Sequence, residues 1–229
     1  MMRLVLVPGL LNDGALWRDQ IEPLKAVCDP VVADITQGEK LSDLVDAVLS
    51  VGGDSFALAG FSLGGIVAQE VMKTAPERVT HLALLDTTMK PDSVERADER
   101  RFLTALAKNP GRFHGFGENL LKRYLAPENL DNEEMANRIR DMTARLGPEI
   151  FIRQSQISRP DHHVVLRTIS VPTLVLCGEY DQLTPPDIHR EMAALIPTAR
   201  LAIVKHAGHM TPIETPDVIT VALKRLMER

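Results

Sequence analysis

Short apolar segments alternate with segments of helical periodicity along most of this 229-residue chain. The first apolar segment, residues 4–7, is an unbroken run of Leu and Val that ends at Pro8-Gly9, which is typical of a strand buried on both faces of a sheet. Strands that alternate with helices favour a parallel sheet covered by helices. We predict strands at residues 4–7, 31–33, 56–60, 79–85, 173–177 and 201–204. The pattern therefore predicts an α/β fold with a six-stranded, mostly parallel sheet flanked by helices.

The alternation stops between residues 87 and 168, where the sequence has helical periodicity and no convincing strand. We predict that residues 1–86 and 169–229 form the α/β core, and that residues 87–168 form a helical cap (lid) subdomain inserted after the fourth strand. This segment contains 14 basic and 12 acidic residues, whereas the rest of the chain contains 12 basic and 19 acidic ones. A mildly basic cap over an acidic core raises the hypothesis of a substrate with an acidic acyl group.

The composition excludes several classes of protein. With 26 basic and 31 acidic residues, the formal charge is −5, so the chain lacks the positive footprint of a general nucleic-acid binder. Two cysteines, Cys28 and Cys177, are too few for a disulfide framework, and no Cys/His spacing indicates a metal site. The apolar start, residues 4–11, is too short and too broken for a signal peptide or a membrane span. We expect a soluble, cytoplasmic protein with no nucleic-acid or membrane partner.

A serine between two glycines follows the predicted strand at 56–60, because Gly60-Phe61-Ser62-Leu63-Gly64 fits the pattern G-x-S-x-G. Between a strand and a helix, this pattern places the serine on a tight, strained turn with its hydroxyl above the sheet. The glycines keep side chains clear of the adjacent strand and helix. A helix is predicted at residues 64–75, so the motif has the required context. We predict that Ser62 is a nucleophile, against the alternative of a chance match in a surface turn.

A nucleophilic serine needs a base and an acid that orients the base. In this topology the acid follows a strand that comes after the serine, and the histidine follows a later strand again. The predicted strand at 173–177 leads into Gly178-Glu179-Tyr180-Asp181. We favour Asp181 as the acid, with Glu179 as an alternative. Asp86, at the end of the predicted strand at 79–85, is a further alternative.

The histidine is expected after the last predicted strand, residues 201–204. That strand leads into Lys205-His206-Ala207-Gly208-His209. We favour His209 as the base because it follows the glycine that opens the loop. His206 lies closer to the strand end and is predicted to be structural or exposed.

Taken together, these stretches resemble the α/β-hydrolase superfamily. The matching residues are 7–11 (VPGLL) with Trp17, 60–65 (GFSLGG), 171–181 (VPTLVLCGEYD) with Thr184, Pro185 and Pro186, and 208–210 (GHM) with Glu214 and Pro216. The resemblance covers the predicted core. The segment 87–168 lies where that family places its helical cap. The resemblance implies that Ser62 is the nucleophile, His209 the general base and Asp181 the orienting acid.

The resemblance also implies an oxyanion hole formed by the backbone amides of Leu10 and Leu63, and a reaction that needs neither a metal nor an organic cofactor. Two departures from the family pattern matter. Pro8 stands where the family often has a histidine before the first glycine, but a backbone donor does not depend on that side chain. The chain also begins at what corresponds to the family's third strand, which limits the expected sheet to six strands.

The expected activity is hydrolysis of a small carboxylic ester, lactone or thioester through an acyl-enzyme, with a small molecule as the partner. Two alternatives use the same scaffold: a lyase or carbon–carbon bond hydrolase with the same serine and histidine, and a non-catalytic receptor for a small ligand. Six side chains are candidates for the substrate pocket, namely Leu11, Trp17, Met135, Met142, Arg159 and Met210.

Overall fold

The computed structural model describes residues 1–109, 113 and 115–229, and within them the chain forms a six-stranded sheet of order β2-β1-β3-β4-β5-β6. The strands are β1 (Arg3–Val7), β2 (Asp29–Val32), β3 (Phe56–Phe61), β4 (Val79–Leu85), β5 (Thr173–Gly178) and β6 (Ala199–Val204). The predicted fold class is confirmed, with one correction: all neighbouring strands are parallel, not most of them. The reason is that each connection between consecutive strands contains a helix, which returns the chain to the same end of the sheet.

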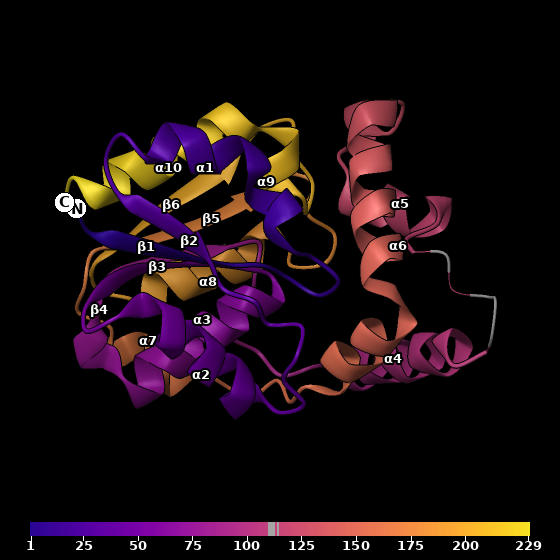
Figure 1. Cartoon of the computed structure of the whole chain (residues 1–229), viewed down its shortest axis with the longest axis horizontal. Helices are drawn as coiled ribbons and strands as arrows, with labels where there is room; N and C mark the ends of the chain where they lie inside the picture. Colours follow the sequence, from indigo (N-terminus) through magenta and orange to yellow (C-terminus); the bar gives the residue numbers. More distant parts are fainter. Residues whose placement is uncertain (110–112, 114) are drawn as a thin grey trace.

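Helices cover both faces of the sheet (Figure 1). One face carries α1 (Arg18–Leu24), α9 (Thr211–Glu214) and α10 (Pro216–Met227), and the other carries α2 (Leu41–Gly52), α3 (Leu63–Thr74), α7 (His163–Thr168) and α8 (Pro186–Leu195). Side chains of β1 alternate between the two resulting cores: Leu4 and Leu6 face one, and Val5 and Val7 face the other. Burial on both faces explains the unbroken apolar run in the sequence.

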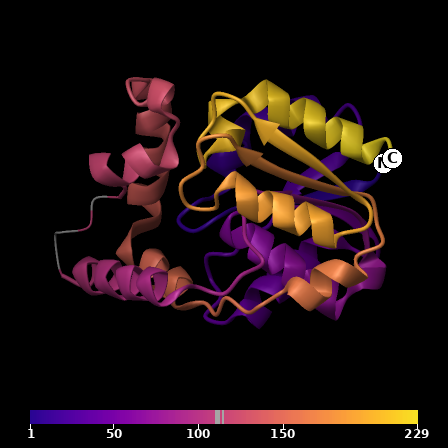
Figure 2. The ribbon, with the colours of Figure 1, turned by 180° about the vertical axis from the view of Figure 1, so that it is seen from behind.

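The segment between β4 and α7 stands beside the sheet, at the end where the strands finish (Figures 1 and 2). Its helices are α4 (Val94–Ala107), α5 (Glu118–Tyr124) and α6 (Glu133–Gln156). We call these three helices and their connections the insert. Its described residues form no strand. Helix α6 is kinked at Gly147-Pro148, where the glycine has φ +76° and proline removes a backbone donor. We call the sheet and the helices on its two faces the body. Helix α7 follows the insert and packs against α3 and α8 of the body.

The structure differs from the sequence prediction near the second strand. A 3-10 turn (Gly14–Trp17) precedes α1, and α1 ends at Leu24. Strand β2 begins at Asp29, two residues before the predicted start. Asp29 pairs with Arg3 in the register of the sheet and accepts hydrogen bonds from its guanidinium, so this polar residue extends the edge strand. Over the described ranges, no helix combines the length and the apolar character that a membrane span requires.

Candidate active site

Ser62 lies on a sharp turn between β3 and α3, with φ +53° and ψ −115°. Positive φ is strained for a residue that carries a Cβ, and it is a feature of the turn that this motif encodes. Its backbone is held on both sides: the amide donates to Leu85 at 3.0 Å, and the carbonyl accepts from the hydroxyl of Thr87 at 2.7 Å. The turn therefore directs the Ser62 side chain toward the end of the sheet, where it is partly exposed.

The glycines of the motif are required by close backbone packing. A Cβ on Gly60 would lie 2.3 Å from the carbonyl oxygen of Gly64, and a Cβ on Gly64 would lie 2.3 Å from the carbonyl oxygen of Val7. Those neighbouring atoms belong to the backbone and cannot move aside as a flexible side chain can. Strand β3, helix α3 and the end of β1 therefore approach one another only because these positions lack side chains.

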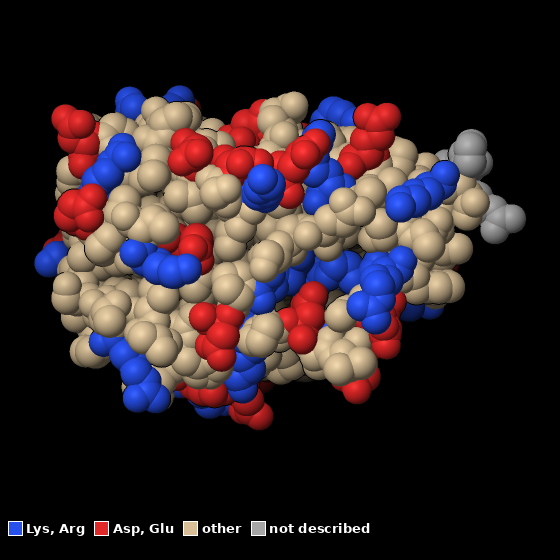
Figure 3. All heavy atoms as spheres, turned by 90° about the horizontal axis from the view of Figure 1, so that it is seen from below, with Lys and Arg blue, Asp and Glu red and all other residues tan. Residues whose placement is uncertain are grey.

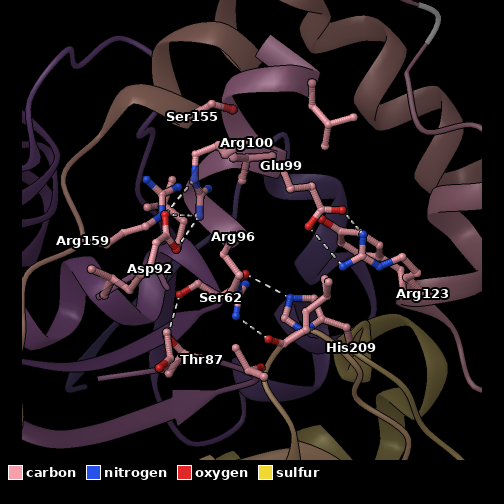
Figure 4. A pocket seen from close by; sticks show the side chains of 18 of the residues that line it. Ser62, Thr87, Asp92, Arg96, Glu99, Arg100, Arg123, Ser155, Arg159 and His209 are labelled. Atoms are coloured by element: carbon pink, nitrogen blue, oxygen red, sulfur yellow. Dashed lines mark hydrogen bonds and ion pairs between the residues drawn. The ribbon is translucent and has the colours of Figure 1, made fainter. Parts of the chain in front are cut away.

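A chain of hydrogen bonds runs from Ser62 through His209 to Asp181 (Figure 4). The Oγ of Ser62 is 3.0 Å from Nε2 of His209, and Nδ1 of His209 is 2.9 Å from Oδ2 of Asp181. The imidazole and the carboxylate are both buried, with exposed fractions of 1% and 3%. Such an arrangement can move a proton from the serine hydroxyl to the imidazole while the carboxylate holds the ring.

The Asp181 carboxylate accepts several hydrogen bonds at once. Oδ1 accepts from the amides of Leu183 at 2.8 Å and Thr184 at 2.9 Å, and Oδ2 accepts from the Thr184 hydroxyl at 2.6 Å. Burial raises the pKa of Asp181, but the charge of His209 and the hydrogen bonds from His209 and Thr184 outweigh burial and hold the pKa below its ordinary value. Asp181 therefore stays ionised beside the imidazole.

The three residues considered as alternatives to Asp181 and His209 take no part in this chain of hydrogen bonds. Asp86 accepts from the amide of Gly178 at 3.0 Å and from the Thr211 hydroxyl, and it makes no hydrogen bond to His209. Burial, followed by repulsion from Asp181, raises the pKa of Asp86 well above its ordinary value. His206 is exposed and pairs with Glu128, and Glu179 is exposed as well.

The backbone amides of Leu10 and Leu63, near Ser62, have no protein acceptor among the described residues. Leu63 is the first residue of α3, where helical geometry leaves N–H groups unpaired. The loop after β1 carries Leu10 and is held by Gln154 of α6. The buried Gln154 side chain accepts from the Leu11 amide at 2.8 Å and donates to the carbonyl of Ile35 at 3.2 Å. Leu11 itself has φ +53°.

The loop that carries His209 is tied to the insert by Glu214 of α9. One carboxylate oxygen of Glu214 accepts from the amides of Gly208 at 2.9 Å and Met210 at 3.1 Å. The other accepts from the amide of Ala126 at 2.7 Å and from the side chain of Asn129 at 2.8 Å. Burial raises the pKa of Glu214, although these four bonds counteract it.

A pocket opens at Ser62 between the body and the insert. It is lined by Leu10, Ser62, Leu63, Ile66, Thr87, Thr88, Asp92, Arg96, Glu99, Arg100, Leu103, Leu120, Arg123, Tyr124, Phe151, Ser155, Arg159, Leu183, Thr184 and His209. Of the six side chains predicted for a substrate pocket, this lining includes Arg159 alone. The body contributes the hydrogen-bonded pair of Ser62 and His209 to this lining. The insert contributes apolar side chains and charged ones.

The other five predicted pocket residues lie in the apolar core. Leu11, Trp17, Met142 and Met210 are each fully buried, and Met135 packs against the same core. Met135 and Met142 of α6 therefore lie on an apolar face that packs on the core around the loop after β1, and the prediction that they line the pocket is corrected accordingly.

Comparison with known proteins decides the family. The model of the alpha/beta hydrolase family matches residues 4–222. The chain belongs to the alpha/beta hydrolase family. It is therefore an enzyme of the hydrolase class, as its resemblance implied, and its fold is the α/β-hydrolase fold.

Several known proteins are similar over most of this chain. A thermophilic esterase from Thermogutta terrifontis, solved with malate bound, has a TM-score of 0.85 and 26% identity, covering 100% of this chain and 90% of its own. A pimeloyl-[acyl-carrier protein] methyl ester esterase from Neisseria meningitidis is 27% identical over 75% of this chain and 68% of its own length. The polyketide synthase ThaQ of Burkholderia thailandensis is 28% identical over 90% of this chain, which spans 11% of that protein.

Sequence reasoning missed several residues that shape this hydrolase site. Gln154 and Glu214 each join two loops that are far apart in the sequence, and Arg96 enters the pocket from α4. Glu214 was noticed as part of the resemblance, but no role followed from it. The available signal was a glutamate four residues after the Gly-His-Met run, next to the predicted catalytic histidine. If buried there, its carboxylate needs several hydrogen-bond donors, which nearby loops can supply. Gln154 and Arg96 carried no local signal.

Proposed function

We propose that this hydrolase cleaves small carboxylic esters, lactones or thioesters through an acyl-enzyme on Ser62. The observation that carries the proposal is the chain of hydrogen bonds from Ser62 through His209 to Asp181. Ser62 and His209 also line a pocket that can hold a substrate. The esterase from Thermogutta terrifontis and the methyl ester esterase from Neisseria meningitidis, both similar over much of the chain, support an ester as the substrate.

The proposed reaction begins when Oγ of Ser62 attacks the carbonyl carbon while Nε2 of His209 takes the hydroxyl proton. Asp181 holds the Nδ1–H of His209 and stabilises the imidazolium that forms. The oxyanion accepts hydrogen bonds from the amides of Leu10 and Leu63, each such donor contributing on the order of 3 kcal/mol to barrier lowering. The leaving alcohol or thiol receives the proton from His209. Water, activated by His209, then attacks the acyl carbon and releases the acid and free Ser62.

We propose that residues 87–168 serve as a cap over a core formed by residues 1–86 and 169–229. Apolar side chains of the insert, including Leu103, Leu120 and Phe151, line the same pocket as Ser62. These side chains would cover the acyl group and exclude water from the oxyanion. We also propose a cytoplasmic location, because Cys28 and Cys177 are both free and buried thiols, as a reducing compartment allows.

Hydrolysis of p-nitrophenyl esters of increasing acyl length tests this function. We expect the wild type to release p-nitrophenol, and Ser62→Ala to lose several orders of magnitude in kcat while keeping its fold. The length profile measures how far the pocket extends. Equal rates in the wild type and in Ser62→Ala would contradict the proposal. A folded wild type with no activity on any ester would direct attention to a lyase or a carbon–carbon bond hydrolase.

A further inference from the structure

The pocket at Ser62 is rich in charged side chains. Its lining contains four arginines and two acids, namely Arg96, Arg100, Arg123, Arg159, Asp92 and Glu99. The described lining therefore has two more guanidinium groups than carboxylates. Figure 3 shows Lys and Arg side chains gathered where the insert meets the body. A substrate pocket with this balance attracts an anion.

Two of these arginines are already matched by carboxylates. Arg100 and Asp92 form a bidentate ion pair. The Nε of Arg100 donates to Oδ2 of Asp92 at 3.0 Å, and its Nη2 donates to Oδ1 at 2.7 Å. Arg123 forms an ion pair with Glu99 nearer to solvent. In each pair the carboxylate neutralises the guanidinium, so neither arginine offers an unpaired positive charge to a ligand.

Arg159 and Arg96 are held differently. The terminal nitrogens of Arg159 donate to the carbonyls of Ile157 and, at 3.3 Å, Gln154, both at the end of α6. Arg96 donates to the carbonyl of Leu183 at 2.7 Å. Among the described residues, no carboxylate forms an ion pair with either guanidinium. The carbonyls hold both groups in place, but the Nε–H of each has no protein acceptor there.

The positive charge on Arg159 is poorly compensated. Burial, and then the neighbouring charges of Arg100 and Arg96, lower its pKa to about 9, although Asp92 partly counteracts them. Figure 4 shows Arg159 beside the Arg100–Asp92 pair, and Arg96 lines the same pocket. An unpaired cation in such surroundings is stabilised when an anion binds next to it.

We propose that Arg159, with Arg96 beside it, binds a carboxylate of the substrate, so that the protein prefers esters carrying a carboxylate to neutral esters. The inference rests on the proposed ester hydrolysis and names its substrate class. A carboxylate presents two coplanar oxygens to a guanidinium fork, which is the geometry of Asp92 on Arg100 in the same pocket. The carboxylate belongs to either the acyl or the alcohol part of the ester, and the experiment separates these two cases.

Two matched pairs of esters test the preference. p-Nitrophenyl hydrogen glutarate is compared with p-nitrophenyl pentanoate for an acyl-side carboxylate, and p-acetoxybenzoate with its methyl ester for an alcohol-side one. We expect kcat/KM to be roughly 10- to 100-fold higher for the charged member of one pair, the range of a charge-assisted hydrogen bond. The pair that responds identifies the side that carries the carboxylate.

Variants connect the preference to the residues. Arg159→Gln should abolish the ratio of kcat/KM between charged and neutral esters, and Arg96→Gln should reduce it, which keeps the test valid if one variant fails to fold. Arg101→Gln is the matched control. It removes the same charge from α4 as Arg96→Gln does, but the Arg101 side chain is 72% exposed, pairs with Asp98 and lies outside the pocket. The control should keep the wild-type ratio.

Calorimetric titration of Ser62→Ala with glutarate separates the two proposals. Glutarate should bind Ser62→Ala and fail to bind Ser62→Ala/Arg159→Gln. If no ester is hydrolysed but this difference in binding is seen, ester hydrolysis is refuted and the carboxylate site stands. If neutral esters are hydrolysed as fast as charged ones in both pairs, ester hydrolysis stands and the carboxylate site is refuted. The inference is also overturned if Arg159→Gln keeps the wild-type ratio of kcat/KM between charged and neutral esters. Inhibition by phosphate without inhibition by glutarate would overturn it as well.

Discussion

Replacing Asp181 with asparagine should reverse the tautomer of His209. In the wild type, Oδ1 of Asp181 accepts from the amides of Leu183 and Thr184, at 2.8 and 2.9 Å. An asparagine must keep its only oxygen toward these two N–H groups, because its NH₂ group cannot accept from them. The NH₂ group is then placed where Oδ2 was, facing Nδ1 of His209 at about the 2.9 Å that separates the two atoms now.

A donor in that place makes Nδ1 the acceptor and puts the ring proton on Nε2. The Nε2 atom, 3.0 Å from Oγ of Ser62, can then no longer take the serine proton. The same change of tautomer in a Ser-His-Asp protease lowers kcat by about 10⁴-fold. We expect a loss of about that size for Asp181→Asn at neutral pH, with an intact fold, because the substitution keeps the shape of the side chain and both backbone bonds.

The assay is kcat for p-nitrophenyl acetate, with Asp86→Asn as the matched control. Asp86 is another buried carboxyl near this site, and its pKa is raised well above the ordinary value by burial and by Asp181. An asparagine there can still accept from Gly178 and donate to Thr211, so the control should keep near wild-type kcat. Wild-type kcat in Asp181→Asn, or a loss confined to Asp86→Asn, would refute the assignment of the acid.

Three further predictions concern residues that support the site. Glu214→Ala should lower the free energy of unfolding by about 3 kcal/mol in a denaturant titration, because the amides of Ala126 and Gly208 lose their acceptor and the amide of Met210 keeps only its 3.3 Å bond to Tyr124; Glu214→Gln should lose less, and wild-type stability in the alanine variant would contradict this. Gln154→Met removes the acceptor of the Leu11 amide and should lower kcat by roughly tenfold with little change in KM, as loss of oxyanion stabilisation does; a change in KM alone would argue against it. Burial lowers the pKa of His189 from 6.5 to about 4, so the unfolded chain takes up this proton first as the pH falls. Stability should therefore fall between pH 6.5 and 4, by on the order of 3 kcal/mol, and His189→Gln should flatten that part of the profile.

The sequence predicted the fold well because its signals were local. Each of the four inner strands, β1, β3, β4 and β5, contains a short apolar run, and burial on both faces leaves little else such a run can form. The turn at Ser62 is encoded within five residues, since Gly60 and Gly64 make room for the backbone that surrounds it. The topology then orders the loops, and for that reason Asp181 and His209 could be named from their positions after later strands.

The pocket was harder to predict, because its walls depend on how the insert packs. Met135 and Met142 lie on one apolar face of α6, but helical periodicity in a sequence carries no information about what lies opposite such a face. The face covers the core near Leu11, and the pocket is lined from other directions. Arg159 is the one predicted pocket residue that lines the pocket, whereas Arg96 on a highly charged helix resembles any solvated arginine in the sequence.

The insert takes part in building the site as well as covering it. Gln154, from its longest helix, holds the loop that carries Leu10, and Glu214 joins the loop of His209 to the amide of Ala126 in the insert. The amide of His209 itself donates to the carbonyl of Tyr124 at 2.7 Å. The loops that carry Leu10 and His209 are therefore held by contacts with the insert, and so is the loop that carries Asp181, because Arg96 donates to the carbonyl of Leu183. In each case the contact is a hydrogen bond to backbone. Because bonds to backbone constrain the path of a loop more than the choice of its side chains, substitutions of other pocket residues can change substrate preference while these anchors keep the loops in place.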